Sequence, residues 1–530
     1  MPKKLRENLK LDILLTLIET PGELGASVKR RKLNVKPDLA QIKCRYSQIE
    51  WLMGIMQKSE IVADRLNDFF CHVPLLAWDH LVLSPCLEIH EFFEIKSFLW
   101  VYGKLRALFL EYDSKQLHPL PELDKLFKLL DPDGNGLPCF RISELYDKRL
   151  LKLSKERFEY AEKLKHARKT ILEEARLKLN SPGLKEEFVL SRTQEDFIAR
   201  IVKSKFFSIS SESLANINFR LADNLKTLRY KTELELLRQA SEKLEHEIRV
   251  KLTSKVFEHI PKLETAWKSC EELVWEFSLA RFALRYDCCI PRLNNRSPEI
   301  KIHSAVNLPL KLALENQGRH YQSLDLCFSK DSNLLTGPNM GGKTTALITL
   351  GQLCHLASWA VPLPAACAEL PIFDDIYYNH DNHEQSESLS SFGREVVSFV
   401  QFVSRKGKKL ILLDEFARGT NPEEGEALCL GVLKYLQKHQ ISFVAATHFS
   451  APTRLKEVSH FSIKGIPPEA LKELEGTSRN TLEERLKHLS EAMDYSLQLL
   501  KKTQTPPKCA LRIASILGMP DEITNQIDEY

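Results

Sequence analysis

The stretch TGPNMGGKTTAL, residues 336–347, has the residue types and spacing of a loop that binds phosphate. It satisfies the pattern G-x-x-x-x-G-K-[ST], in which glycines allow backbone N–H groups to face the phosphates. A helix that begins at the end of the loop adds its partial positive charge. Lys343 is expected to reach the β- and γ-phosphate oxygens, and Thr344 to offer its hydroxyl to Mg²⁺. The residues predicted to bind the nucleotide are Gly337, Pro338, Asn339, Met340, Gly341, Gly342, Lys343, Thr344 and Thr345.

Two later segments supply the other groups that phosphoryl transfer requires. The apolar run KKLILLDEF ends in adjacent carboxylates, a pattern also found where any buried strand meets a polar turn. In a nucleotide site, Asp414 would hold Mg²⁺ through water and Glu415 would orient or deprotonate the attacking water. The run ISFVAATH ends in His448, which could sense the γ-phosphate. We therefore predict an ATPase with Glu415, His448 and Lys343 as catalytic residues.

The segments that position these residues differ between the two halves of the chain. Short apolar strands alternate with helices from about residue 300 to 466, as in βαβ units. Upstream, long charged helices are expected at about 143–178 and 224–259, with short strands between them at 188–210. Two long helices that leave a body and return predict a projecting arm with a small tip.

Composition limits the compartment and the partners. The 75 basic residues nearly balance the 71 acidic ones, so nucleic-acid contact would have to be local. Twelve cysteines without a C-x-x-C pair indicate reduced thiols. The short, charge-interrupted apolar run at the N-terminus is not expected to act as a secretory signal, and no apolar stretch reaches membrane-spanning length. We therefore expect a cytoplasmic protein without a membrane partner.

TGPNMGGKTT, LLDEFARGT and ATH together resemble the ATPase domain of the MutS family, a branch of the ABC ATPases. SLSSFGRE stands where that family has a signature segment, and Ser390 is the best match to the signature serine. In the family this serine reaches the nucleotide of the opposite subunit. Tyr321 stands where the family often places an aromatic residue near adenine. The resemblance implies ATP and Mg²⁺ as cofactors and a second MutS-like subunit, either identical or a diverged homologue.

The predicted fold is a multidomain chain with an α/β P-loop (ABC-type) ATPase domain, preceded by an all-α core with a long helical lever and clamp arm. We expect a helical core at 1–142 and the lever and clamp arm at 143–290, with a strand-rich tip at about 185–222. The ATPase domain is expected at 291–466, and a helical linker with C-terminal dimerisation helices at 467–530.

The resemblance implies a dimeric clamp in which closure of the ATPase pair moves the helical arms on DNA, in a role like DNA mismatch repair. Mismatch-reading members carry an N-terminal domain with a Phe-x-Glu motif and a connector domain, and too few residues precede the expected core for both. The triplet Phe92-Phe93-Glu94 lies in an amphipathic helix and is better explained by packing. Branched or distorted DNA, recognised by shape, would then be bound besides mismatched DNA. The tip, with nine basic and six acidic residues at 185–231, permits such contact.

A second function is open, because a short MutS-like branch that this architecture also resembles serves a protein client. That branch is the ATPase of a reactivase for adenosylcobalamin-dependent lysine 5,6-aminomutase, with no DNA role. An ABC transporter subunit is disfavoured, since SLSSF replaces L-S-G-G-Q.

Two segments imitate metal sites. DPDGNG at 131–136 resembles half of a calcium loop, but Ile142 stands where the loop needs Glu, so a tight turn is expected. His380 and His383 lack the H-E-x-x-H pattern, and no metal is expected there.

Overall fold

The computed structural model describes residues 3–112, 118–338, 342–379, 391–475, 482–500, 510–520 and 523. The chain divides into two compact units. The sheet unit comprises residues 1–72, 109–118 and 269–530, and the arm unit comprises 73–108 and 119–268. This division follows contacts within the chain, so the domain boundaries expected from the sequence remain a prediction.

The sheet unit is built on a six-stranded sheet in the order β13-β12-β7-β11-β10-β9. Five neighbouring strands are parallel, and only β13 is antiparallel to its neighbour β12. Every residue of the central strands β7 and β11 is buried, as expected for a sheet covered on both faces. The strands are β7 Ser332–Thr336, β9 Asp375–Tyr378, β10 Lys409–Asp414, β11 Ser442–Ala446, β12 Ser459–Gly465 and β13 Asp494–Leu499.

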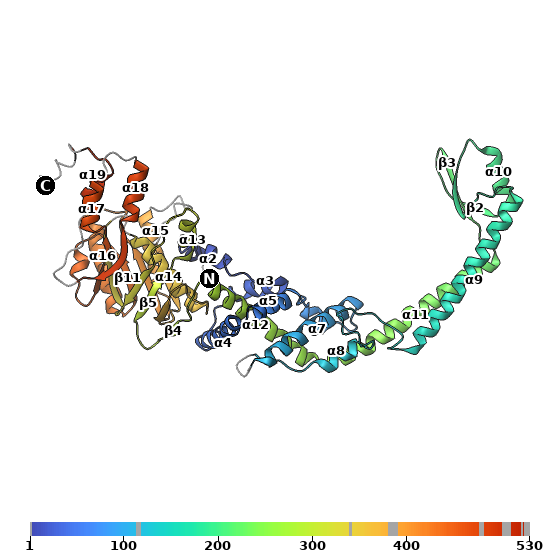
Figure 1. The fold of residues 1–530 in the computed structure, drawn as a ribbon, viewed down its shortest axis with the longest axis horizontal. Coiled ribbons are helices and arrows are strands. Elements are labelled where there is room, and N and C mark those ends of the chain that lie inside the picture. Colours follow the sequence, from blue (N-terminus) through green and yellow to red (C-terminus); the bar gives the residue numbers. More distant parts are fainter. Residues whose placement is uncertain are drawn as a thin grey trace. The chain divides into compact units, whose positions relative to one another are not determined.

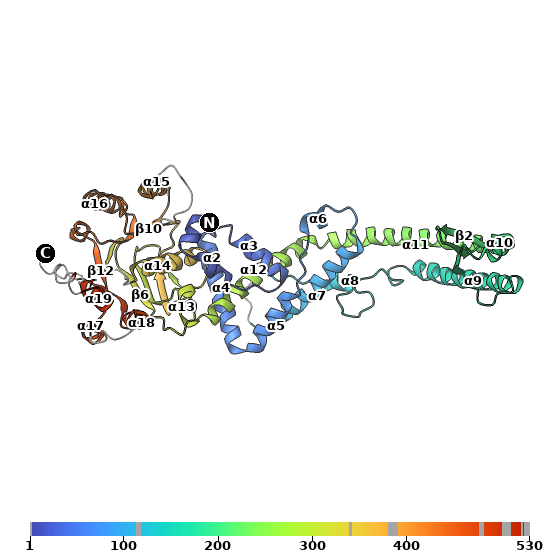
Figure 2. The same ribbon diagram turned by 90° about the horizontal axis from the view of Figure 1, so that it is seen from above.

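Helices cover the two faces of this sheet (Figure 2). On one face, α15 (Ser391–Val403) and α16 (Pro422–Lys438) pack against side chains such as Ile411 and Phe443. Successive side chains of a strand point to opposite faces, so Leu412 is directed to the other face. There α14 (Lys343–Ser358) approaches closely, since a Cβ on its Gly351 would lie 2.9 Å from Leu412 Cδ1.

A smaller mixed sheet and a set of helices complete the sheet unit (Figure 1). The smaller sheet has the order β4-β8-β5-β6. Its strands are β4 Arg292–Leu293, β5 Ile300–Ala305, β6 Leu324–Phe328 and β8 Cys367–Leu370. The helices are α1 Lys3–Asn8, α2 Leu11–Thr16, α3 Gly22–Lys32, α4 Leu39–Lys58, α5 Glu60–Cys71, α13 Leu308–Glu315 and, from residue 269 onward, α12 Ile260–Arg285.

The C-terminal part of the sheet unit contains a strand that the sequence analysis did not anticipate. Helices α17 (Pro468–Glu475), α18 (Leu482–Glu491) and α19 (Ala510–Ile516) lie in the segment expected to be helical. Between them, β13 pairs antiparallel with β12 and extends the main sheet. The linker is therefore not wholly helical, because the edge of the sheet offers backbone partners that local propensity does not reveal.

The arm unit pairs two long helices, α9 (Lys148–Lys178) and α11 (Leu225–Phe257), which lie side by side (Figures 1 and 2). Both occur where the sequence predicts long charged helices. Asp147 caps α9, and Asn224 and Thr227 form a capping box at the start of α11. Shorter helices of this unit are α6 Trp78–Leu83, α7 Ile89–Glu111 as far as residue 108, and α8 Asp124–Leu130.

A small three-stranded antiparallel sheet in the order β1-β3-β2 lies at one end of this helix pair. Its strands are β1 Glu187–Ser191, β2 Phe207–Glu212 and β3 Asn216–Leu221. Residues 195–204, predicted as strand, instead form α10 (Glu195–Ser204). That prediction was wrong because Phe197, Ile198 and Ile201 follow helical spacing and pack on the sheet of the tip.

The segment at 131–136 that resembles half of a calcium loop forms a tight turn, and its Asp131 carboxylate already has protein hydrogen-bond donors. Lys96 Nζ donates to Asp131 Oδ1 at 2.8 Å and to Cys139 O at 2.8 Å. Asp131 Oδ2 accepts from Gly136 N at 2.9 Å. Burial raises the pKa of Asp131, but these donors outweigh burial and leave its pKa below the ordinary value. A lysine therefore supplies the positive charge at this turn.

In the part of the chain that the structure describes, no helix is long and apolar enough to cross a membrane.

Replacing Lys96 with alanine would leave the buried Asp131 carboxylate without its cation. We expect the free energy of local opening at residues 131–140 to fall by about 3–5 kcal/mol. Hydrogen–deuterium exchange of peptides from α7 and this turn measures that loss. Lys125→Ala, at an exposed position on α8, is the control. Equal protection in both variants would contradict the role of the buried pair.

Candidate functional site

The predicted phosphate loop joins the end of a central strand to the start of a helix. Strand β7 ends at Thr336, and α14 begins at Lys343 after Gly342, whose φ of 88° lies in the left-handed region. Asn339, Met340 and Gly341 lie outside the described residues, as do Ser390, His380 and His383. The described part therefore has the strand, loop and helix order that a phosphate cradle requires.

Parallel strands bring the remaining predicted residues to the same edge of the sheet. Strand β10 ends at Asp414 and pairs with β11, which ends at Ala446. Strand β11 in turn pairs with β7. Ligands of open α/β sheets bind at the carboxyl ends of strands. The strand ends thus bring Gly337, Asp414 and Glu415 to the edge where α14 begins, and His448 follows the end of β11.

Lys343 lies at the centre of the edge and is only 7% exposed. Its Nζ donates to Gly337 O at 3.0 Å and Pro338 O at 3.3 Å. The same Nζ lies 4.0 Å from Glu415 Oε1. Burial lowers the pKa of Lys343, while the carboxylates of Glu415 and Asp414 act in the opposite direction. A buried ammonium held by carbonyl oxygens can exchange them for phosphate oxygens.

Glu415 begins a turn with two residues in the left-handed region, Glu415 at φ 51° and Ala417 at φ 64°. Its backbone N donates to Ala446 O at 2.9 Å, which ties the turn to the end of β11. Arg418 Nη1 donates to Glu415 Oε2 at 2.7 Å. The Glu415 carboxylate therefore lies between the buried Lys343 and the exposed Arg418.

Asp414 is flanked by polar groups of Tyr378, the last residue of β9, and of Asn379, which follows it. Tyr378 Oη donates to Asp414 Oδ2 at 3.2 Å. Burial, with the nearby Asp414 carboxylate, raises the pKa of Tyr378 well above its ordinary value, so its hydroxyl stays protonated as a donor. Asn379 bonds to the backbone of Asp414 on both sides, accepting from its N and donating to its O at 3.1 Å. These bonds fix Asp414 at the edge.

The other predicted residues occupy separate positions. Thr344 is exposed at the start of α14, and Thr345 O accepts from Thr349 Oγ1 at 2.6 Å. His448 is exposed, and its ring lies 4.3 Å from that of Phe449. The contacts described above join Lys343 to Glu415, which directly follows Asp414 in the chain, and they do not include His448.

Tyr321 is connected to α14 through one intermediate residue. Its hydroxyl accepts from Asn307 N at 2.7 Å, and Asn307 Nδ2 donates to Thr349 Oγ1 at 3.3 Å. Burial raises the pKa of Tyr321. Its ring is held near the helix that follows the phosphate loop.

Tyr495 on β13 is an aromatic neighbour of the loop that sequence reasoning missed. A Cβ on Gly342 would lie 2.9 Å from Tyr495 Cδ1, so this ring packs directly on the last glycine of the loop. Gln322 Oε1 accepts from Tyr495 N at 3.0 Å, and Gln322 Nε2 donates to Asp494 Oδ1 at 3.0 Å. Polar and apolar residues alternate in DYSLQL, which is typical of a strand, but the helical pattern of the surrounding segment concealed this signal.

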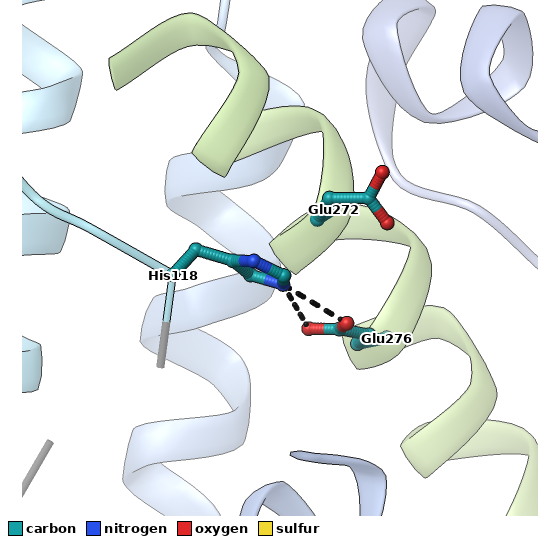
Figure 3. Close-up of side chains that lie close together, drawn as sticks. All are labelled: His118, Glu272 and Glu276. Carbon is teal, nitrogen blue, oxygen red and sulfur yellow. Dashed lines mark hydrogen bonds and ion pairs between the residues drawn. The ribbon is translucent and has the colours of Figure 1, made fainter. Parts of the chain in front are cut away.

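A second polar cluster of the sheet unit contains His118, Glu272 and Glu276 (Figure 3). Their ligand-type atoms all lie within 4.8 Å of one another. His118 Nε2 bonds to Glu276 Oε1 at 3.0 Å and Oε2 at 3.1 Å, and Glu276 is 1% exposed. By residue type alone, such a set could hold a metal ion.

Protein cations already neutralise this cluster. Lys32 forms an ion pair with Glu272 Oε1, and Arg45 Nη2 lies 3.9 Å from Glu272 Oε2. With its amide nitrogen directed inward, Gln48 donates to Glu276 Oε2 at 3.3 Å. Burial lowers the pKa of His118, but the Glu276 carboxylate outweighs this and leaves its pKa above the ordinary value. We infer a structural network that fastens His118 to α12 and α4.

The raised pKa of His118 predicts a pH-dependent contribution to stability. The contribution is complete below the ordinary value of 6.5 and is lost as pH rises through the folded-state pKa. In His118→Gln, which cannot titrate, we expect the stability deficit relative to wild type to be largest at acidic pH and to shrink above neutrality. Urea unfolding from pH 5.5 to 8.5 measures the difference, with the exposed His320→Gln as control. A deficit that grows with pH would contradict this assignment.

Comparison with known proteins adds an independent view of the site. A family model described as MutS domain V matches residues 333–529, which include Lys343, Asp414, Glu415 and His448. Endonuclease MutS2 of Caldanaerobacter subterraneus subsp. tengcongensis is 23% identical over 473 residues, covering 85% of this chain and 57% of that protein. Endonuclease MutS2 of Clostridium tetani is 30% identical over 228 residues, covering 41% of this chain and 27% of that protein.

The chain thus spans little more than half the length of the first of these relatives and a smaller share of the second. The similarity to the first relative nevertheless extends over most of the chain, beyond the region that domain V covers. The chain is therefore similar to MutS-family proteins over most of its length.

Proposed function

We propose that this protein binds ATP at the carboxyl edge formed by β7, β11 and β10, and hydrolyses it. The observation that carries the proposal is the position of buried Lys343 between the carbonyl oxygens of the loop and the Glu415 carboxylate. A lysine at the start of a helix, beside two adjacent carboxylates, has the composition that phosphoryl transfer needs. Gly337, Pro338 and the residues that follow through Thr345 are proposed to surround the phosphates.

The residues at this edge fit a magnesium ion. Thr344 is an exposed residue that carries a hydroxyl group, and Tyr378 holds the carboxylate of Asp414 in place. Both are oxygen ligands of the type that Mg²⁺ binds. When bound, Mg²⁺ would neutralise charge on the phosphate oxygens.

The proposed reaction divides its tasks among three side chains. Glu415 accepts the proton of a water molecule that attacks the γ-phosphorus. The bond from that phosphorus to the bridging oxygen breaks, which yields ADP and phosphate. Lys343 leaves Gly337 O and Glu415 to stabilise negative charge on the phosphate oxygens. His448 remains a proposed sensor of the γ-phosphate.

Tyr495 and Tyr321 are proposed to lie beside the part of the nucleotide that the phosphate loop does not contact. The ring of Tyr495 packs on Gly342, and Gln322 links β13 to the segment that carries Tyr321. Aromatic rings provide stacking surfaces for a base at modest conformational cost. Both tyrosines would thus lie near the adenosine part of ATP.

We further propose that the protein is an ABC-type ATPase that works as a dimer. Ser390 of each subunit would contact the nucleotide of the other subunit, and the arms would contact DNA. The support is the match to MutS domain V and the name of the relatives, Endonuclease MutS2. The nuclease activity in that name is not transferred, since this chain spans only part of those proteins. In the tip, Arg200, Lys203 and Lys205 are exposed on or directly after α10 and could contact phosphates. The aminomutase reactivase finds no support in these relatives.

Glu415→Gln should reduce steady-state ATP turnover by about 100-fold or more, because the amide cannot accept the proton. ATP affinity should be retained, since Glu415 is not proposed to bind the nucleotide. Lys343→Ala should instead weaken ATP binding. Phosphate release and equilibrium binding of a fluorescent ATP analogue measure the two effects. Unchanged turnover in Glu415→Gln would contradict its role as base.

DNA binding should depend on ATP and on salt, with branched or mismatched DNA bound more tightly than plain duplex. The triple variant Arg200→Ala/Lys203→Ala/Lys205→Ala should reduce the slope of log K against log[salt] by about 0.9 for each phosphate that is no longer neutralised. Fluorescence anisotropy across a salt series measures this, with Lys434→Ala/Lys438→Ala on exposed α16 positions as control. Absence of binding to every DNA at low salt with ATP would reject the clamp and favour a protein client.

A further inference from the structure

Helix α15 contacts two segments that lie next to Asp414 and Glu415. Asn379 follows β9, and Ala417 lies two residues beyond Glu415. Glu395 on α15 accepts from Asn379 Nδ2 at 2.6 Å through Oε1 and from Ala417 N at 3.1 Å through Oε2. One carboxylate thus bridges the residue that brackets Asp414 and the turn that carries Glu415.

Aromatic contacts join the same three segments independently of this bridge. The ring centroid of Phe399 on α15 lies 5.9 Å from that of Tyr377 on β9 and 5.6 Å from that of Phe416. Phe402, one turn further along α15, lies 5.2 Å from Tyr377. Aromatic pairs at these separations attract each other beyond simple burial. The position of α15 is therefore coupled to both β9 and the turn after β10.

The turn itself depends on external support. Glu415 and Ala417 both have positive φ, although neither is glycine. Such conformations persist only where the surroundings hold them. The bond from Ala417 N to Glu395 and that from Glu415 N to Ala446 O are contacts of this kind. Loss of the first would allow the turn to relax and the Glu415 carboxylate to move.

Asn379 uses both ends of its amide in the network. Its Oδ1 accepts from Asp414 N, and its Nδ2 donates to both Asp414 O and Glu395. We propose that Glu395 and Asn379 form a positioning pair through which the location of α15 sets the geometry of Asp414 and Glu415 and thereby the rate of ATP hydrolysis. The inference rests on the proposed ATPase function. Neither residue is a catalytic group, because both act through the backbone of their neighbours.

The pair can be tested by exchanging the hydrogen-bond donor on Asn379 and the acceptor on Glu395. In Glu395→Gln, the oxygen of the new amide accepts from Ala417 N. Its nitrogen then faces the amide nitrogen of Asn379, and because both are donors no hydrogen bond forms between them. In Asn379→Asp, two carboxylates oppose each other. In the double variant, the amide nitrogen introduced at position 395 can donate to the carboxylate introduced at position 379. The amide oxygen at position 395 can still accept from Ala417 N, so only the bond to Asp414 O is not restored.

Each single variant should lower the rate of ATP turnover at saturating ATP by about 10- to 100-fold, the scale of a small misplacement of reacting groups. Affinity for the fluorescent ATP analogue should change less than about 3-fold, and the melting temperature should stay close to wild type. The double variant should recover at least about a third of the lost factor on a logarithmic scale, as expected for directly coupled residues. Gln401→Ala, at an exposed position of α15, is the control and should behave as wild type.

Three outcomes would overturn the proposal. Single variants with wild-type turnover would show that the pair does not position the carboxylates. If melting temperature and nucleotide affinity both fell while the rate of ATP turnover at saturating ATP stayed unchanged, the role of the pair would be purely structural. Additive losses in the double variant would show that the two residues do not act together. A wild-type protein that does not hydrolyse ATP would instead reject the proposed function, so the two failures are distinguishable.

Discussion

The rest of the site depends on a buried ammonium group that is surrounded by oxygen atoms. Lys343 has lost most of its exposure to water, and it is held by two carbonyl oxygens of the loop and faces Glu415. A buried charge without such partners would be strongly disfavoured. The parallel sheet provides them, because strands running in one direction deliver the loop, Asp414 and Glu415 to a single edge. Under the proposed function, a phosphate group and a water molecule would meet the same residues that stabilise Lys343.

Much of this arrangement can be predicted from the sequence because it depends on local order. The alternation of strands and helices, the glycines before Lys343 and the adjacent Asp414 and Glu415 all lie within short segments. The long charged helices α9 and α11 are likewise predicted from periodicity alone. The structure supplies the distances, which bring Lys343 and Glu415 to 4.0 Å although they lie far apart in the sequence.

The features that escaped prediction depend on contacts distant in sequence. Strand β13 forms because the edge of β12 is available, so Tyr495 reaches Gly342 from a segment with a helical pattern. Residues 195–204 were expected to be a strand, yet they form a helix because its apolar face covers the sheet of the tip. The bridge from Glu395 to Asn379 and Ala417 joins three separate elements, and no local pattern indicates it. The roles of Ser390, Asn339, Met340 and Gly341 remain predictions, as these residues lie outside the described part of the chain.

The proposed ATPase function requires Lys343 to exchange its protein oxygen partners for those of ATP. A structure of the Glu415→Gln variant, determined with ATP and Mg²⁺, would reveal this exchange. We expect Lys343 Nζ to lie within hydrogen-bonding distance of the β- or γ-phosphate oxygens and to be released from Gly337 O, with Asp414 and Thr344 near the metal. ATP bound elsewhere, or Lys343 still on the loop carbonyls beside bound ATP, would contradict it.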